Sequence, residues 1–339
     1  MQVLLSEAAY LRVSDRLATI SADLDVITVD PAGIFKRAGE PIDGIGVDPE
    51  VFWVSLDVYF SGMLPSFFAR IRRGTQGKWA QMFFAGLDSP VLTELIAHGI
   101  RITKNSAQSQ AIAEYVMCHA LSLLHPIAEQ RRAQQAREWK RINFREIGET
   151  RWLLVGLGAI GTEIARRLRP FGAHLTVFRR SNTPTTLAAD TRPTSDLFHH
   201  LSDADVVILA CALNDETRGI AGLEFFKAIK KGSLLINIAR GGLVDEAALK
   251  AGLERDQPAL AVLDVFGTEP LPCDSWFWDH PKVSVTAHCS NAGSGVLARG
   301  DSLFLDNLRR YCSEEPLLHE VHPGTVGIDI TDNRRLIGV

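Results

Sequence analysis

The sequence predicts an α/β protein with a doubly wound parallel sheet in its second half. Between residues 151 and 288, short apolar runs that suit strands alternate with segments of helical periodicity. This alternation is typical of a parallel sheet covered by helices on both faces. A glycine-rich turn from Gly156 to Gly161 follows the first apolar run and opens a helical pattern, as expected near the start of such a sheet.

Length and composition limit the class of protein. The chain has 339 residues, which favours two domains over one. The net charge of −4 gives no reason to expect nucleic acid or a membrane as a partner. No apolar stretch approaches the ~20 residues of a membrane span, and the first residues lack the pattern of a secretory signal. We therefore expect a cytoplasmic protein.

The five cysteines are widely spaced and form no CxxC pair. An odd number at such spacing argues against a disulfide framework or a structural zinc site and favours reduced thiols. A zinc site on His280, His288 and Cys289 would match no familiar ligand spacing, so we expect no metal.

The first third of the chain also alternates strand-like and helix-like segments. Buried strands are expected at residues 24–29, 51–55 and 79–84, a helix at 91–97 and a short strand at 101–103. A long helix is expected over residues 111–131, with Pro126 kinking or ending it. We expect helices rather than a flexible linker to join the two domains.

Six positions lie at or just after the ends of the strands expected in the second half. The strands are expected at residues 152–155, 174–178, 205–210, 233–239, 260–263 and 283–287, and the positions are Gly156, Arg179, Cys211, Arg240, Asp264 and His288. Ligands of open parallel sheets bind outside the carboxyl ends of the strands. This arrangement suggests a dinucleotide enzyme with acid–base chemistry. A further helix is expected at 292–310, before an irregular tail.

The glycine-rich turn has the spacing of a dinucleotide-binding loop. Gly156 would permit a tight turn, Gly158 would let the backbone approach a pyrophosphate, and Gly161 would let the helix pack on the strand. The helix that follows would offer its N-terminal N–H groups to the phosphates. A glycine-rich turn without a ligand is the alternative.

The residues after the second strand favour NADP(H) over NAD(H). An acidic residue is expected there when the ribose 2′-hydroxyl of NAD is bound, but the chain has Arg179, Arg180 and Ser181. Arginines suit the 2′-phosphate of NADP through paired hydrogen bonds. The alternative is that both arginines are solvated surface residues, with NAD as the cofactor.

Four residues could carry acid–base chemistry. Arg240 at a strand end could hold a carboxylate, and His288 could donate a proton while Glu269 stabilises its protonated form. Asp264 ends a neighbouring strand. Each residue alone also suits a capping, turn or core role. Their shared position at strand ends of one sheet favours the chemical interpretation.

Five motifs resemble the D-isomer-specific 2-hydroxyacid dehydrogenase family, closest to its glyoxylate/hydroxypyruvate reductase-like members. They lie at residues 155–161 (VGLGAIG), 211–219 (CALNDETRG), 237–246 (NIARGGLVDE), 263–272 (LDVFGTEPLP) and 286–290 (TAHCS). The resemblance implies a Rossmann cofactor domain over 104–290 and a flavodoxin-like substrate domain over 1–103 and 291–339. It also implies a homodimer formed through the cofactor domain and the helix at 111–131.

The resemblance also implies a role for each site residue. Arg240 would bind the substrate carboxylate, His288 would be the general acid, and Glu269 would pair with His288. Residues 84–88 resemble a substrate loop, with Ala85 and Gly86 binding substrate. The cofactor contacts implied are Gly156, Gly158, Ala159, Ile160, Gly161, Arg179, Arg180, Ser181, Cys211, Ala212, Thr217, Ile238, Ala239 and Asp264. The chain departs from the family pattern at Ala212 and Ala287, where proline is usual.

The implied function is hydride transfer between NADP(H) and a 2-oxo or D-2-hydroxy acid such as glyoxylate or hydroxypyruvate. One alternative is a formate- or phosphite-type dehydrogenase on the same fold. Formate enzymes that resemble this family pair the histidine with glutamine, so Glu269 argues against formate. The other alternative is a nucleotide-sensing, corepressor-like interaction protein, which the same residues do not exclude.

Overall fold

The computed structural model describes residues 1–86, 90–181 and 183–322. The chain divides into two compact units, each with its own seven-stranded sheet. The first unit comprises Met1–Ala107 and Ser294–Val339, and the second comprises Gln108–Gly293. The fold class is therefore α/β, as the sequence predicted.

The sheet of the first unit has the order β4-β3-β2-β1-β5-β6-β7. Its strands are β1 Gln2–Ser6, β2 Asp25–Val29, β3 Phe35–Arg37, β4 Glu40–Pro41, β5 Val51–Trp53, β6 Trp79–Gln81 and β7 Arg101–Thr103. All pairs are parallel except β2 with β3 and β3 with β4. The four strands expected in this region are confirmed, whereas β1 and the short β3–β4 hairpin were not predicted.

Helices cover both faces of this sheet. They are α1 Glu7–Leu17, α2 Leu56–Phe60, α3 Leu64–Arg73, α4 Pro90–Ala97 and α11 Val296–Cys312. Because successive strand residues point to opposite faces, Val3 and Leu5 pack with α1 and α11 while Leu4 packs on the other side. The expected helix at 292–310 exists but begins at Val296 and ends at Cys312.

The sheet of the second unit is entirely parallel, with the order β10-β9-β8-β11-β12-β13-β14. Its strands are β8 Arg151–Val155, β9 His174–Arg179, β10 Asp190–Pro193, β11 Val206–Leu209, β12 Leu234–Asn237, β13 Leu260–Leu263 and β14 Val283–Val285. The six expected strands are confirmed. The chain order reverses between β8 and β11, which creates a topological switch point where ligands bind in such sheets.

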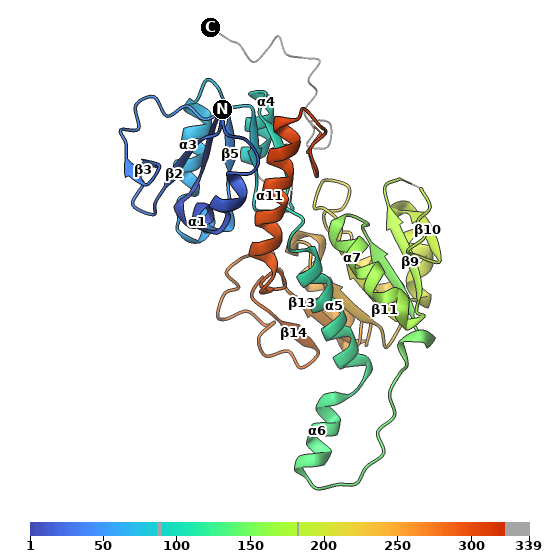
Figure 1. The fold of residues 1–339 in the computed structure, drawn as a ribbon. Helices are drawn as coiled ribbons and strands as arrows, with labels where there is room; N and C mark the ends of the chain where they lie inside the picture. Colours follow the sequence, from blue (N-terminus) through green and yellow to red (C-terminus); the bar gives the residue numbers. More distant parts are fainter. Residues whose placement is uncertain (87–89, 182, 323–339) are drawn as a thin grey trace. The chain divides into compact units, whose positions relative to one another are not determined.

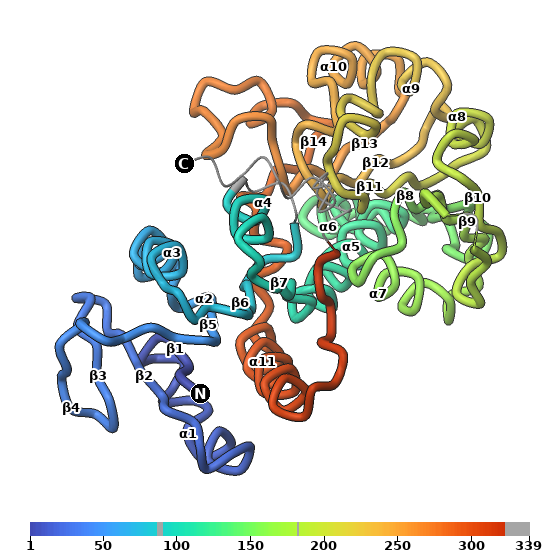
Figure 2. The backbone as a smooth tube through the Cα atoms, turned by 90° about the horizontal axis from the view of Figure 1, so that it is seen from above, coloured from blue at the N-terminus to red at the C-terminus, as the bar shows by residue number. Residues whose placement is uncertain are grey.

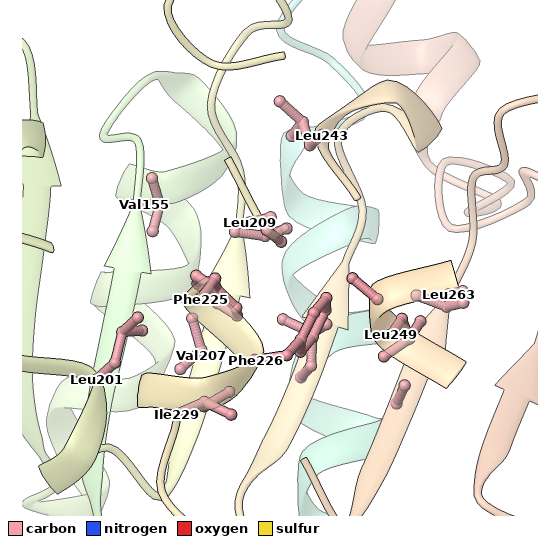
Figure 3. Packing of buried hydrophobic residues seen from close by; sticks show 14 of the residues in the cluster. Val155, Leu201, Val207, Leu209, Phe225, Phe226, Ile229, Leu243, Leu249 and Leu263 are labelled. Carbon is pink, nitrogen blue, oxygen red and sulfur yellow. The ribbon is translucent and has the colours of Figure 1, made fainter. Parts of the chain in front are cut away.

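Two helical layers enclose this second sheet (Figures 1 and 2). Helices α5 Ser109–Leu124 and α7 Ala159–Leu168 lie on one face, and α8 Leu197–His200, α9 Leu223–Ala228 and α10 Glu246–Glu254 lie on the other. Figure 3 shows how Phe225 and Phe226 of α9 pack against the sheet beside Val207 and Leu209. Short 3-10 turns are η1 Ile147–Glu149, η2 Arg169–Phe171, η3 Thr194–Asp196, η4 Leu201–Asp203 and η5 Gly241–Leu243.

The long helix expected at 111–131 is two helices. Helix α5 ends at Leu124, and α6 Ile127–Gln135 starts after Pro126 with a bend of 54° between the two. Proline lacks the N–H that a continuous helix needs, and its ring restricts the preceding residue, so the break falls there. Among the described residues, no single helix meets the length and hydropathy expected of a membrane span, and only the bent α5–α6 pair does so jointly.

Candidate active site

The six positions identified from the sequence lie along one edge of the second sheet. The strand register aligns Val155 with Phe178 and Leu209, Asn237 with Leu209 and Leu263, and Leu263 with Val285. The residues that follow these ends therefore emerge at the same carboxyl edge. This edge includes the switch point between β8 and β11.

The three glycines of the β8–α7 turn differ in what a side chain at each position would meet. Gly156 has a φ of +105°, and a Cβ there would lie 2.7 Å from the Ala210 carbonyl oxygen. A Cβ at Gly161 would lie 2.2 Å from the Gly156 oxygen. A Cβ at Gly158 would meet nothing within 4 Å. The protein's own packing thus requires Gly156 and Gly161, whereas Gly158 leaves open backbone that a phosphate group could approach.

Gly158 is also the N-cap of α7, followed by Ala159, Ile160 and Gly161. The first N–H groups of a helix have no partner within the helix, and the N-terminus carries a partial positive charge. The first turn of α7 contains no acidic residue, and no side chain caps it. This terminus therefore fits an anionic pyrophosphate from outside the protein.

The residues expected to select the cofactor lie next to this turn. Arg179 is the last residue of β9, which pairs with β8, and its side chain is half-buried, while Arg180 and Ser181 are exposed. Neither arginine forms an ion pair with any residue that the structure describes. Both guanidinium groups are therefore available for an external anion.

The loop after β11 holds its own shape. Thr217 donates its hydroxyl to the Ala212 carbonyl oxygen at 2.7 Å and accepts from the Asn214 N–H at 2.9 Å. Its hydroxyl thus fixes the loop beside Cys211. Burial raises the pKa of the Cys211 thiol to about 11, so the thiol is neutral near pH 7 and is no nucleophile there.

The backbone on both sides of Arg240 is fixed. Asn237 is fully buried, accepts from the Ala239 N–H at 3.1 Å and donates to the Arg240 carbonyl oxygen at 2.9 Å. A Cβ at Gly241 would lie 1.9 Å from the Phe266 carbonyl carbon, so only glycine fits. Ile238 and Ala239 are buried, whereas Arg240 is half-buried. Asn237 was not among the site residues predicted from the sequence, although a polar residue at the end of an apolar strand is a usable signal.

Asp264 is fully buried and anchors the loop that follows β14. Its Oδ1 accepts from the Thr286 hydroxyl at 2.6 Å and from the Cys289 N–H at 2.9 Å, and its Oδ2 accepts from the Ser290 N–H at 3.0 Å. Its carbonyl oxygen accepts from the His288 N–H at 2.9 Å. The carboxylate expected to contact a cofactor is therefore bonded to the protein's own chain on both oxygens.

His288 and Glu269, 19 residues apart in the sequence, are hydrogen-bonded. The distance from His288 Nδ1 to Glu269 Oε2 is 2.7 Å, and Glu269 Oε1 accepts from the Phe266 N–H at 2.9 Å. Since an ionised carboxylate can only accept, Nδ1 carries the hydrogen and Nε2 is left for other partners. The imidazole is 43% exposed, so Nε2 can be reached from outside.

Ala85 and Gly86, expected to bind substrate, lie in the first unit after β6 and are half-buried. The Asn105 N–H donates to the Phe84 carbonyl oxygen at 3.0 Å, which fixes the start of this segment. Leu87 and Asp88, which complete the expected substrate loop, lie outside the described residues.

Two residues of α5 contribute to the site, although the sequence predicted only that they lie in a helix. The Tyr115 hydroxyl lies 2.7 Å from the Thr286 hydroxyl. The His119 ring packs against Tyr115 with centroids 4.2 Å apart, and burial lowers the pKa of His119 below 6.5. No spacing rule reveals this contact, because Tyr115 and Thr286 are 171 residues apart.

The chain is similar to known proteins both in sequence and in fold. Residues 117–290 match the family model of the D-isomer specific 2-hydroxyacid dehydrogenase NAD binding domain. The chain is 36% identical over 210 residues to D-3-phosphoglycerate dehydrogenase of Bacillus subtilis, covering 60% of this chain and 39% of that protein. It is 30% identical over 185 residues to glyoxylate/hydroxypyruvate reductase A of Serratia proteamaculans, covering 55% of this chain and 59% of that protein. The matches thus span less than two thirds of both relatives.

A solved structure resembles the chain over nearly its full length. It is a D-isomer specific 2-hydroxyacid dehydrogenase from Xanthobacter autotrophicus in complex with NADPH and MES. The TM-score is 0.75 at 26% identity, covering 96% of this chain and 98% of the other. With more than half of its residues matching the family model, the chain belongs to the D-isomer specific 2-hydroxyacid dehydrogenase family.

Proposed function

We propose that the protein reduces a 2-oxo acid to a D-2-hydroxy acid with NADPH, with glyoxylate and hydroxypyruvate as the leading substrates. The observation that carries this proposal is the His288–Glu269 hydrogen bond at the sheet edge that also bears Gly158 and Arg240. The similarity to the Serratia reductase supports this choice of substrates. We assign cofactor binding to the second unit, and we propose that Ala85 and Gly86 of the first unit bind substrate.

NADPH is the proposed cofactor, with NADH as the alternative. Arg179 ends β9 and Arg180 follows it, where an acidic residue would be expected for NAD, and both supply positive charge for a 2′-phosphate. The solved relative from Xanthobacter contains NADPH. The open backbone at Gly158 and the uncapped α7 terminus fit the pyrophosphate.

The residues have separate roles in the proposed reaction. When bound, NADPH supplies the hydride. Arg240 would hold the substrate carboxylate through two N–H groups and polarise the neighbouring carbonyl. His288 Nε2 would donate a proton to the carbonyl oxygen as negative charge develops there. Glu269 would hold the imidazole through Nδ1, so that Nε2 faces the substrate.

We also propose a cytoplasmic homodimer that uses the segment after α5. All five cysteines are free, which suits a reducing compartment. Trp139 is fully exposed, and Ile127 and Phe144 are also exposed. Exposed aromatic residues of this kind are typical anchors of protein interfaces. Light scattering should give a dimer mass, and Trp139→Ala should shift the population toward monomer; a monomeric wild type would contradict this assignment.

The activity is tested by following NADPH and NADH oxidation with a panel of 2-oxo acids. The panel contains glyoxylate, hydroxypyruvate, pyruvate, and branched and aromatic 2-oxo acids. We expect turnover with NADPH and at least one small 2-oxo acid. If NADPH binds but no 2-oxo acid consumes it, the protein is instead a nucleotide-sensing member of the fold.

A further inference from the structure

A continuous chain of hydrogen bonds connects helix α5 to the loop that carries His288. The Tyr115 hydroxyl lies 2.7 Å from Thr286 Oγ1, which lies 2.6 Å from Asp264 Oδ1. The Asp264 carboxylate then accepts the N–H groups of Cys289 at 2.9 Å and Ser290 at 3.0 Å. All of these residues belong to the second unit.

The hydrogen bonds from Tyr115 to Asp264 allow only one arrangement of donors and acceptors. The Asp264 carboxylate accepts from two backbone N–H groups and a hydroxyl, so Thr286 must give its single hydroxyl hydrogen to Asp264. Tyr115 must therefore donate to Thr286. Burial raises the pKa of Tyr115 to about 12, so the phenol keeps the required hydrogen near neutral pH. Because each donor and acceptor is fixed, these hydrogen bonds restrain the position of the loop and do not relay protons.

The loop restrained by these hydrogen bonds, residues 286–290, contains strained backbone. His288 has a φ of +48°, in the left-handed region that is unfavourable for an ordinary L-residue. Such a conformation persists only where its surroundings impose it. Here Thr286 is bonded before His288, Cys289 and Ser290 are bonded after it, and Asp264 supplies an oxygen to each of these bonds.

We propose that Tyr115 is a positioning residue for His288, acting through Thr286 and Asp264. Its ring packs against His119 at a centroid distance of 4.2 Å, so the hydroxyl is presented from a supported side chain. The hydroxyl restricts Thr286 to the rotamer that bonds Asp264. The effect of Tyr115 on proton transfer by His288 rests on the proposed function, whereas its effect on the order of the loop at residues 286–290 does not.

The first test measures loop order in the full-length protein without reference to activity. Tyr115→Phe removes the hydroxyl and keeps the ring. Losing one hydrogen bond of about 1 kcal/mol should make amide hydrogen exchange at Cys289 and Ser290 about fivefold faster. Thr286→Val should have at least this effect, and Thr286→Ser, which keeps the hydroxyl, should restore slow exchange. Adding Tyr115→Phe to Thr286→Val should change nothing further.

A matched control separates the local effect from general destabilisation. Tyr311→Phe removes a hydroxyl that donates to Glu50 at 2.7 Å in the first unit. It should leave exchange at Cys289 and Ser290 at the wild-type rate. Unchanged exchange in Tyr115→Phe, with faster exchange in Thr286→Val, would show that Tyr115 only packs and would overturn the proposal.

The second test measures positioning of His288. In Tyr115→Phe, kcat for 2-oxo acid reduction should fall about three- to tenfold, while the Kd for NADPH stays within about twofold. Thr286→Ser should keep most of kcat and Thr286→Val should not. Faster exchange with an unchanged kcat would overturn the positioning role. If the wild type reduces no 2-oxo acid, the proposed function fails, but the exchange experiment still decides whether Tyr115 orders the loop.

Discussion

At the residue scale, two neighbouring carboxylates act on His288 in different ways. Glu269 bonds Nδ1 of the imidazole and thereby sets which nitrogen faces outward. Asp264 bonds the backbone around His288 and thereby sets where the imidazole lies. The loop has Ala287 where the family usually has proline, so hydrogen bonds to Asp264 provide restraint that a proline ring would otherwise add.

Arg179 should decide the cofactor. Arg179→Asp would replace a cation that suits the 2′-phosphate with an anion that repels it. We expect kcat/KM for NADPH to fall about 100-fold, consistent with ~3 kcal/mol for a charge-assisted pair, while the ratio of NADH to NADPH use rises. Arg73→Asp, an exposed arginine of α3 in the first unit, makes the same charge change as a control. An unchanged cofactor ratio in Arg179→Asp would remove the basis for preferring NADPH.

His119 should make stability depend on pH. Burial lowers its pKa in the folded state below 6.5, so the unfolded chain takes up a proton more readily. The neutral, half-buried His119 contributes fully to the stability of the folded state above pH 6.5. This contribution is lost as pH falls through the lower pKa that His119 has in the folded state. His119→Phe keeps a ring against Tyr115 and should flatten this part of the profile, as measured by urea unfolding on either side of pH 6.5. His319 shifts in the same direction, so some pH dependence should remain; an unaltered profile would contradict the assignment.

The sequence could predict those site residues that follow strand ends in one sheet, because topology alone brings them together. Arg240 and His288 are of this kind. The strand-end pattern alone did not single out Glu269, since it lies in a loop; its pairing with His288 across 19 residues was expected from the chemistry of the two groups and from the resemblance. Asn237 and Tyr115 were not recognised as site residues because their roles depend on hydrogen bonds to other segments, which no local pattern encodes.

At the element scale, burial explains which strands the sequence revealed. Strands β8 and β11 to β13 are almost wholly buried and appear as apolar runs. Strand β10 is an edge strand with half-exposed residues and ends at Pro193, so it carries no apolar run. Strand β1 is as long as β2, but the helix that its Ser6 caps begins directly after it, so no turn separates the two patterns in the sequence. Edge strands, and strands that run directly into a helix, therefore need the structure.

Helix α11 should depend on the packing of one buried aromatic residue. Phe304 is fully buried and stacks on Trp53 with ring centroids 4.1 Å apart. Phe304→Ala should lower the free energy of unfolding by about 3–5 kcal/mol, because a large cavity would remain in the first unit. Leu297→Ala, at an exposed position of the same helix, should cost no more than about 0.5 kcal/mol. Equal urea midpoints for these two variants would contradict this account of how α11 is held.

At the scale of the whole molecule, the two units have separate cores. The two largest hydrophobic clusters consist only of residues from the second unit, and the other two consist only of residues from the first. The chain passes between the units twice, at residues 107–108 and 293–294. The second unit is thus one continuous segment.

This organisation predicts that residues 108–293 fold alone. The isolated segment should unfold cooperatively and bind NADPH with a Kd within about tenfold of the full chain, since it contains the glycine turn and Arg179. It should reduce no 2-oxo acid, because it lacks Ala85 and Gly86, the proposed substrate-binding residues. Fluorescence titration and NADPH oxidation measure these two properties. Turnover by the segment alone would show that the first unit is not needed for the reaction.

We propose that His288 donates the proton when a 2-oxo acid is reduced. The most direct measurement compares wild type with His288→Asn, because asparagine tolerates the left-handed backbone that His288 adopts. With the 2-oxo acid that the wild type uses best, we predict that kcat falls by about 10²–10⁴ while the Kd for NADPH changes less than about threefold. A kcat near that of the wild type, or a loss of NADPH binding as large as the loss of kcat, would contradict the account.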